Sequence, residues 1–214
     1  MPSKEKLTKR LFVEGEQDKR VIPYLLEANG IPWEKGNEPV YIQPRGGNDF
    51  TNYWISARLK EAGLTHFGLI LDADEDSSTS WQSIRNACLS SIPDIPHEIP
   101  ETGLIHLTHA GIKFGIWIMP DNQLQGMLET FLAYMVYDES QVLWKYAQKV
   151  VGESKNQGAK FISSHHDKAC IYTWLAWQDP PGRQLHNAIE EKILHPQHPK
   201  AQVFVNWFKN LYDL

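Results

Sequence analysis

The stretch Gly68–Asp76 constrains the fold of this chain more than any other feature. Residues 68–71, Gly-Leu-Ile-Leu, form a short apolar run, and carboxylates follow at Asp72, Asp74 and Asp76. A short apolar run bounded by polar residues is typical of a buried strand, and burial on both faces is typical of a sheet covered by helices. The sequence therefore predicts an α/β sheet with a strand that ends in acidic side chains.

A second acidic strand end lies earlier in the chain. Residues 10–13, Arg-Leu-Phe-Val, predict a first strand, and Glu14 follows it directly. Ligands collect at the carboxyl ends of the strands in open α/β sheets, so Glu14, Asp72 and Asp74 are predicted to converge. Neighbouring carboxylates repel each other unless a proton or cation intervenes, and their oxygens suit Mg²⁺ or Mn²⁺. A strand that runs out into a solvated acidic turn is the alternative, and the acidic run alone leaves both interpretations open.

Strand and helix patterns alternate through residues 1–135. Val40–Ile42 predicts a second strand, residues 50–62 predict a helix, and two further strands are predicted between residues 103 and 118. This alternation favours right-handed crossovers and a mostly parallel sheet flanked by helices. Helical periodicity then dominates, so residues 136–214 are predicted to form a helical extension packed on the α/β domain in one compact unit.

Composition excludes several other classes of protein. The chain has 214 residues, of which 42% are hydrophobic, so it can bury a substantial core. A net charge of −5 argues against tight binding of nucleic acid through overall charge, although a few basic residues beside a metal can still hold phosphate. The charged start and the lack of a long apolar run predict no signal peptide and no membrane span, and hence a cytoplasmic location.

The cysteines and tryptophans are predicted to be structural. Cys88 and Cys170 have no second cysteine at metal-binding or redox spacing, so we expect them to be reduced, buried and inert. Four tryptophans of the helical part are expected mainly in the core rather than as platforms for base stacking. They are Trp144, Trp174, Trp177 and Trp207.

The order of the acidic motifs resembles the Toprim domain of topoisomerases, bacterial primases and OLD-type nucleases. The resemblance rests on Phe12–Asp18, on a glycine-bearing turn after the second strand, and on Leu69–Asp74, and it covers about the first 135 residues. Three later segments resemble an uncharacterised bacterial family of stand-alone, OLD-related Toprim-like proteins. These segments are Gly115–Pro120, Gly126–Glu129 and Lys168–Gly182. The second resemblance spans nearly the whole chain and implies a Rossmann-like sheet.

The Toprim resemblance implies a role for each of the first three acids. Glu14 matches the Toprim glutamate, which serves in general acid–base chemistry or in metal binding. Asp72 and Asp74 match the pair of acids that holds Mg²⁺. We therefore expect a magnesium or manganese site with Glu14 also as a catalytic residue.

The resemblance also implies a second set of residues. Asp18 and Glu129 match additional acids of the OLD-type branch, which would allow a second ion to bind. Lys168 is similar in placement to a catalytic lysine that neutralises charge on the phosphate. The structural alternatives stay open: Asp18 lies where acids stabilise a helix dipole, and Glu129 could be an exposed surface acid.

The turn Arg45-Gly46-Gly47 is a secondary candidate for ligand binding. Its backbone N–H groups could cradle a phosphate, although a Gly-Gly pair is at least as often only a tight turn.

Three functions are compatible with the sequence. The first is a Mg²⁺-dependent phosphoryl-transfer protein of Toprim type, in particular a nuclease-like phosphodiesterase acting on DNA or RNA. The second is a non-catalytic module that binds a metal, a nucleotide or a protein partner. The third is a phosphatase of the haloacid-dehalogenase type, which ranks last because its Asp-x-Asp pair follows the first core strand and leads into Thr or Val. Here the pair follows the third strand and leads into Glu75.

Overall fold

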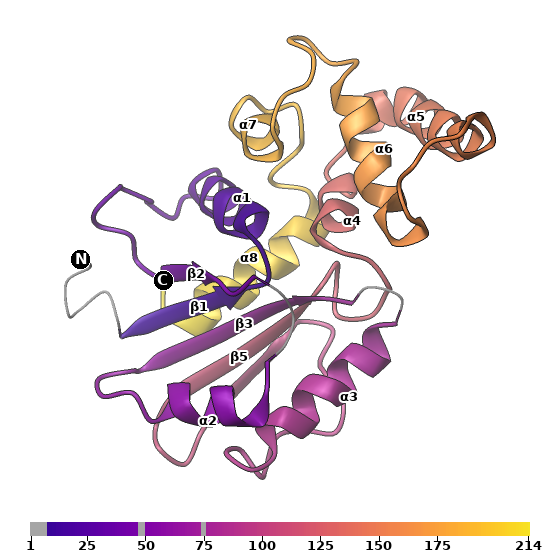
Figure 1. Ribbon diagram of the computed structural model, residues 1–214. Coiled ribbons are helices and arrows are strands. Elements are labelled where there is room, and N and C mark those ends of the chain that lie inside the picture. Colours follow the sequence, from indigo (N-terminus) through magenta and orange to yellow (C-terminus); the bar gives the residue numbers. More distant parts are fainter. Residues whose placement is uncertain (1–7, 47–49, 74–75) are drawn as a thin grey trace.

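The computed structural model describes residues 8–46, 50–73 and 76–214. Its centre is a five-stranded sheet with the order β2-β1-β3-β5-β4 (Figure 1). The strands span Lys9–Val13 (β1), Tyr41–Pro44 (β2), His66–Asp72 (β3), Leu104–Leu107 (β4) and Lys113–Met119 (β5). Strands β2, β1, β3 and β5 are parallel to one another, and only β4 pairs antiparallel, with β5. The predicted mostly parallel α/β sheet is confirmed.

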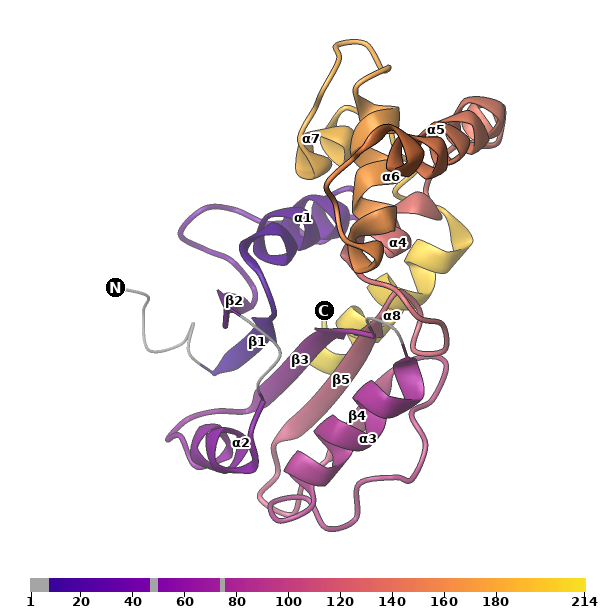
Figure 2. The same cartoon turned by 45° about the vertical axis from the view of Figure 1, so that its right-hand side comes forward.

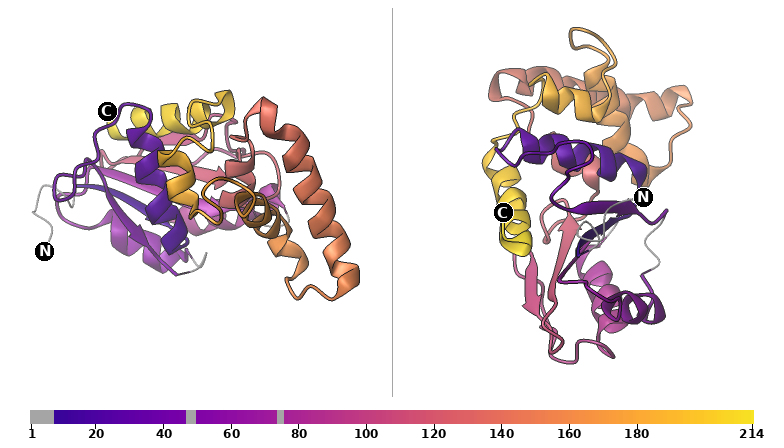
Figure 3. Two further views of the ribbon diagram at one scale, coloured as in Figure 1. Left: turned by 90° about the horizontal axis from the view of Figure 1, so that it is seen from above. Right: turned by 90° about the vertical axis from the view of Figure 1, so that its left-hand side faces the viewer.

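Helices cover both faces of this sheet (Figure 2). Helices α2 and α3 lie on one face, and α8 lies on the other (Figure 3). The α-helices span Glu16–Glu27 (α1), Asn52–Leu59 (α2), Ser77–Cys88 (α3), Leu128–Ala133 (α4), Gln141–Ser154 (α5), His166–Leu175 (α6), Leu185–Glu190 (α7) and Pro199–Tyr212 (α8). Short 3₁₀ helices span Asp138–Ser140 (η2), Lys155–Gln157 (η3) and Ser163–His165 (η4). The C-terminal third is helical, as the periodicity predicts.

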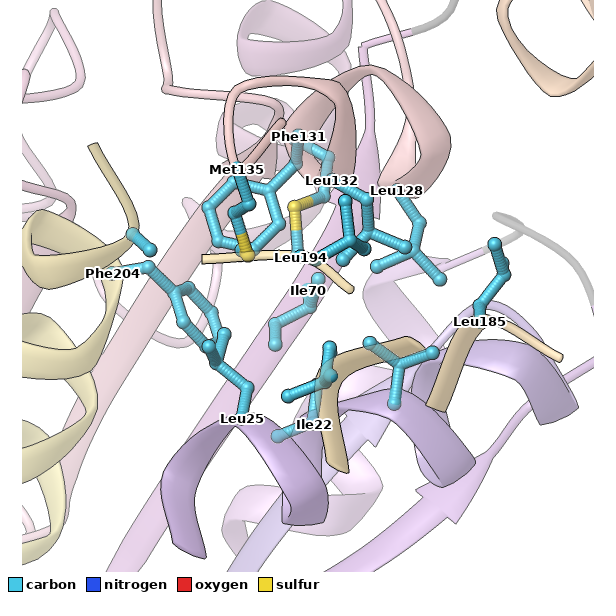
Figure 4. Close-up of a cluster of buried hydrophobic side chains, with 14 of the residues drawn as sticks. Ile22, Leu25, Ile70, Leu128, Phe131, Leu132, Met135, Leu185, Leu194 and Phe204 are labelled. Atoms are coloured by element: carbon cyan, nitrogen blue, oxygen red, sulfur yellow. The ribbon is translucent and has the colours of Figure 1, made fainter. Parts of the chain in front are cut away.

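Two hydrophobic cores form because successive side chains of a strand point to opposite faces. Along β1, Leu11 and Val13 join the core under α1 and α8, whereas Phe12 joins the core under α2 and α3. Figure 4 shows part of the first core, where Ile70 of β3 lies among side chains of α1, α4 and α8. The C-terminal helices therefore share one core with the sheet. The domain boundary at residue 135 stays a prediction.

Helix α8 lies unusually close to the sheet because two glycines leave room for it. A Cβ atom on Gly115 would lie 2.6 Å from Leu211, and one on Gly68 would collide with the Tyr212 hydroxyl. The Tyr212 hydroxyl donates a hydrogen bond to the Arg10 carbonyl at 2.7 Å. The close approach buries the end of α8 directly over β1, β3 and β5, where each buried aromatic side chain stabilises the fold by about 1.5–3 kcal/mol.

The cysteines are free and buried as expected, and one expectation for the tryptophans is wrong. Cys88 and Cys170 are free and buried, and burial raises their thiol pKa values to about 12 and about 11. Trp144, Trp174 and Trp207 are buried. Trp177 is 40% exposed and packs against the exposed Tyr146, with ring centroids 5.6 Å apart, so its assignment to the core was wrong. It lies just past the end of α6, where helical periodicity no longer determines the direction of a side chain.

Within the described residues, no helix is both long enough and apolar enough to pass through a membrane.

Candidate metal centre

The carboxyl ends of β1 and β3 bring Glu14 and Asp72 together. The two strands are parallel neighbours, with Phe12 opposite Leu69, so they end at the same edge of the sheet. The Glu14 carboxylate reaches across this edge, and its Oε1 accepts a hydrogen bond from the Asp72 backbone N–H at 2.9 Å. Both acids are only partly buried.

The Asp72 carboxylate is held by the start of α4. Its Oδ1 accepts a hydrogen bond from the backbone N–H of Leu128, the first residue of that helix, at 3.1 Å. The first N–H groups of a helix have no partner within the helix, and the helix dipole favours a negative charge there. The loop before α4 is tied to the same strand end, because the Ala73 N–H donates to the carbonyl groups of Met119 and Gly126. Asp72 is therefore fixed in position by two strands and a helix.

A second group of charged residues lies beside this pair and is much more deeply buried. Asp18, in the first turn of α1, is 6% exposed, and its carboxylate accepts a hydrogen bond from the Gly15 N–H at 3.1 Å. Glu129, in the first turn of α4, is 3% exposed, and its Oε1 lies 3.2 Å from the Lys168 ammonium. The alternative of an exposed surface acid at Glu129 is excluded. Burial costs a carboxylate its hydration, so buried acids need partners.

The environment of Asp18 disfavours its charged form relative to water. Desolvation by burial raises the Asp18 pKa to about 6, and the negative charge of Glu129 contributes in the same direction. The hydrogen bond from Gly15 and the charge of Lys168 lower the pKa, but they do not compensate for the burial. One half-exposed lysine, Lys168, thus interacts with two buried carboxylates: it pairs with Glu129 and lowers the pKa of Asp18.

The two groups are joined through the backbone. Gly15, whose N–H binds Asp18, directly follows Glu14 in the chain. Leu128, whose N–H binds Asp72, directly precedes Glu129. The two pairs are therefore neighbours along the chain, where β1 and β3 end and where α1 and α4 begin.

Helix α6 completes the site by placing Lys168. The Thr130 hydroxyl of α4 donates a hydrogen bond to Asp167, and the Gln17 amide of α1 donates to the Tyr172 hydroxyl at 3.2 Å. These bonds fasten α6 to the two helices that carry the buried acids. The sequence analysis did not find Thr130, Gln17 or Tyr172. A signal for Tyr172 was its position one helical turn after Lys168, which puts both side chains on the same face of the helix.

Comparison with known proteins places the chain in a family. Residues 8–213 match the family model described as "Protein of unknown function (DUF3226)". The chain belongs to this DUF3226 family. No curated protein matches its sequence. The match covers the sheet together with the C-terminal helices that carry Lys168.

Among solved structures, this DUF3226 protein is similar to the C-terminal region of OLD proteins. It shares 11% identity with that region of the Burkholderia pseudomallei protein, over 96% of this chain and 98% of that chain, with a TM-score of 0.48. For the Xanthomonas campestris pv. campestris protein, in a structure phased with mercury, the identity is 15% over 96% of both chains, with a TM-score of 0.46.

Two predicted site residues, Asp74 and Gly47, lie outside the described residues. The other members of the predicted phosphate cradle have backbone partners: the N–H groups of Arg45 and Gly46 donate to the carbonyls of Val13 and Glu14, each at 2.9 Å. Anion binding through these two amides would require both hydrogen bonds to be given up. The Arg45 guanidinium instead lies 4.5 Å from the centre of the Trp54 ring. Ligand binding by this turn stays a prediction.

The chemistry of the donors fits a hard divalent cation. In the described part of the chain, no group of three or more His, Cys, Asp or Glu side chains is arranged to hold a metal. Mg²⁺ commonly keeps several water ligands and binds proteins through only one or two carboxylates, so Glu14 and Asp72 satisfy its usual demand. The neighbouring Asp18 and Glu129 add negative charge that Lys168 offsets only in part. The assignment of these residues as metal ligands stays a prediction.

Proposed function

We propose that this DUF3226 protein is a Mg²⁺-dependent phosphoryl-transfer enzyme, specifically a nuclease-like phosphodiesterase that acts on nucleic acid. The observation that carries the proposal is the gathering of Glu14 and Asp72 at one sheet edge, beside a buried acid pair with a lysine. The Toprim resemblance supports the same chemistry, because two of the matched acids, Glu14 and Asp72, are in contact at this edge.

In such a reaction, the acidic residues and the lysine of the site would have different roles. Glu14 and Asp72 would hold a divalent cation, which supplies charge stabilisation and an activated water when bound. Lys168 brings a fixed positive charge to the same edge, where it would offset the negative charge that builds on the phosphate oxygens in the transition state. Glu129 holds the lysine in place through the 3.2 Å ion pair.

The decisive experiment is a cleavage assay on plasmid DNA, single-stranded DNA and RNA with Mg²⁺, with Mn²⁺ and with EDTA. Asp72→Asn should lower metal-dependent cleavage by about 10²–10³-fold or more, because it removes a charged ligand from the reacting centre. Asp76→Asn is the matched control. It removes the same charge nearby, and asparagine keeps the N-cap of α3, where Asp76 accepts from the Ser78 N–H at 3.0 Å. Cleavage that persists in EDTA, or an equal loss in both variants, would contradict the proposal.

A second candidate is a metal- or nucleotide-binding module without catalytic activity. The contact between Glu14 and Asp72 suits this function as well, because one or two carboxylates are enough to bind Mg²⁺ without any further catalytic group. A folded wild-type protein that binds Mg²⁺ or nucleic acid and cleaves none of the substrates would support this second function.

A further inference from the structure

A pocket of about 460 Å³ lies beside the acidic strand ends, on the face of the sheet covered by α2 and α3. Glu14 and Asp72 form one end of it. Its apolar wall is formed by Phe50, Leu71 and Ile84, all of which belong to the hydrophobic core under α2 and α3. The same side chains pack into that core as well as lining the pocket.

The face of α3 that lines the pocket carries small side chains beside Ile84. Ser80, Ser83 and Ala87 recur along this face at the spacing of helical neighbours. The Ser80 hydroxyl donates to the Ala73 carbonyl at 3.1 Å, which fixes this wall to the end of β3. Small residues leave the volume open, and the hydroxyl groups at its rim offer both donors and acceptors.

A positive charge lies next to the pocket. The Arg45 guanidinium is 5.5 Å from the centre of the Phe50 ring, which is part of the apolar wall. Arg45 is also joined to the acidic edge, since the next residue, Gly46, donates its N–H to the Glu14 carbonyl at 2.9 Å. The pocket therefore has carboxylates at one end, a cation beside its wall, an apolar surface and a rim of hydroxyls.

We propose that this pocket takes one unpaired nucleotide next to the phosphodiester at Asp72, so that the substrate is single-stranded nucleic acid rather than duplex. The inference rests on the proposed function and names its substrate class. A volume of this size falls in the range of small-ligand sites, and an apolar wall with a polar rim suits the flat face and polar edge of a base. A base in a duplex would first have to leave its stack and its partner, which costs free energy.

The test fills the pocket and measures binding. Ser83→Trp places a large side chain into the pocket from α3. Gln82→Trp is the matched control, because Gln82 is the preceding residue of α3, is exposed and does not line the pocket. The probe is a labelled short single-stranded DNA, with Ca²⁺ in place of Mg²⁺ so that cleavage does not consume it. Ser83→Trp should weaken binding about tenfold or more, and Gln82→Trp should leave it unchanged.

Two further measurements complete the test. Ala87→Leu fills the pocket from the next turn, and it replaces Ser83→Trp as the test if thermal unfolding shows that the tryptophan variant is not folded. The wild-type protein should bind the single strand about tenfold more tightly than the blunt duplex of the same sequence.

Several outcomes would overturn the inference. Equal affinity of the wild type for single strand and duplex would do so, as would a folded Ser83→Trp variant with unchanged affinity. A free nucleoside monophosphate that binds as tightly as the strand would assign the pocket to free nucleotides instead.

The proposed function can fail separately. Absence of metal-dependent cleavage by the wild type would contradict the proposed catalytic function. The difference in binding between Ser83→Trp and Gln82→Trp would still test whether the pocket binds a nucleotide.

Discussion

The two faces of the sheet differ sharply where β1 and β3 end. On the pocket face, formed by α2 and α3, small side chains such as Ser83 and Ala87 leave an open volume beside Asp72. On the acid face, formed by α1, α4 and α6, Asp18 and Glu129 are almost completely buried with Lys168 beside them. One face thus contains an open pocket lined with hydrogen-bonding groups, and the other contains a buried cluster of charged side chains.

The difference teaches how one sheet edge can serve two purposes. Charge that is buried away from water destabilises the folded protein. A bound cation, or a phosphate beside the lysine, can offset this destabilisation because it binds the native state. An open pocket costs less, because its apolar wall is already supported by a packed core. We therefore expect changes on the acid face to alter stability, pH response and catalysis, and changes at Glu14 and Asp72 to alter the metal response. Changes in the α3 wall of the pocket should alter substrate binding alone.

The largest expected effect on stability is the pH response of Asp18. Its pKa is about 6 in the folded protein, above the usual value of 3.8, so folding favours the protonated form. The stability contributed by this proton is fully present below about pH 4 and is lost as pH rises through about 6. Each pKa unit corresponds to about 1.4 kcal/mol, so without metal Asp18→Asn should stabilise the protein above about pH 6 by up to roughly 3 kcal/mol.

The measurement is urea unfolding in EDTA across this pH range. Asparagine cannot ionise, so the gain should vanish towards pH 4. Glu16→Gln is the matched control: Glu16 lies in the same first turn of α1, but its side chain is 64% exposed. A gain for Asp18→Asn that does not depend on pH would show that the burial of this charge is not the cause.

The next effect is catalytic and concerns Lys168. Lys168→Met should lower the rate of metal-dependent cleavage by about 100-fold, because it removes a positive charge from the developing transition state. Lys149→Met on α5 serves as control, since Lys149 is exposed and forms a surface ion pair with Glu153 at 3.8 Å. Single-turnover rates at saturating substrate separate this effect from binding. Similar rates for the two variants would remove Lys168 from the reaction.

A smaller effect tests the close packing of α8 in the core that the acid face shares. Gly115→Ala should destabilise the protein by about 1–3 kcal/mol, because the new Cβ atom would lie 2.6 Å from Leu211. Gly152→Ala is the matched substitution, in α5; among the described residues, nothing beyond its chain neighbours and its own helix backbone lies within 4 Å of the new Cβ atom. It should stabilise by about 0.4–1 kcal/mol through the unfolded state. Denaturant midpoints measure both, and equal effects would mean that α8 adjusts freely.

The smallest expected effect is stabilisation by metal. Mg²⁺ at ten times its dissociation constant should stabilise the native state by about 1.4 kcal/mol and raise the thermal unfolding midpoint. Asp72→Asn should abolish the rise and make the metal-free protein no less stable, because it relieves repulsion between acids. Ser83→Ala, on the pocket face, should keep the full rise. If millimolar Mg²⁺ and Mn²⁺ leave the thermal unfolding midpoint of the wild type unchanged, the protein has no metal site of useful affinity.

The sequence by itself determined the sheet and the place of its first acids. Alternating strand and helix patterns imply parallel strands, and parallel strands end at one edge, so Glu14 and Asp72 had to come close. Local residue order suffices for this, because a strand end carries the next side chain with it. The same reasoning fails at Trp177, which follows the end of a helix and is exposed.

Only the tertiary structure decided what surrounds these acids. The burial of Asp18 and the pairing of Glu129 with Lys168 depend on α6 lying across α1 and α4, where Tyr172 and Asp167 make its contacts. The pocket depends on which face of α3 turns towards β3. Helical periodicity defines the faces of a helix but not its neighbours, because the neighbours are selected by the packing of the whole core.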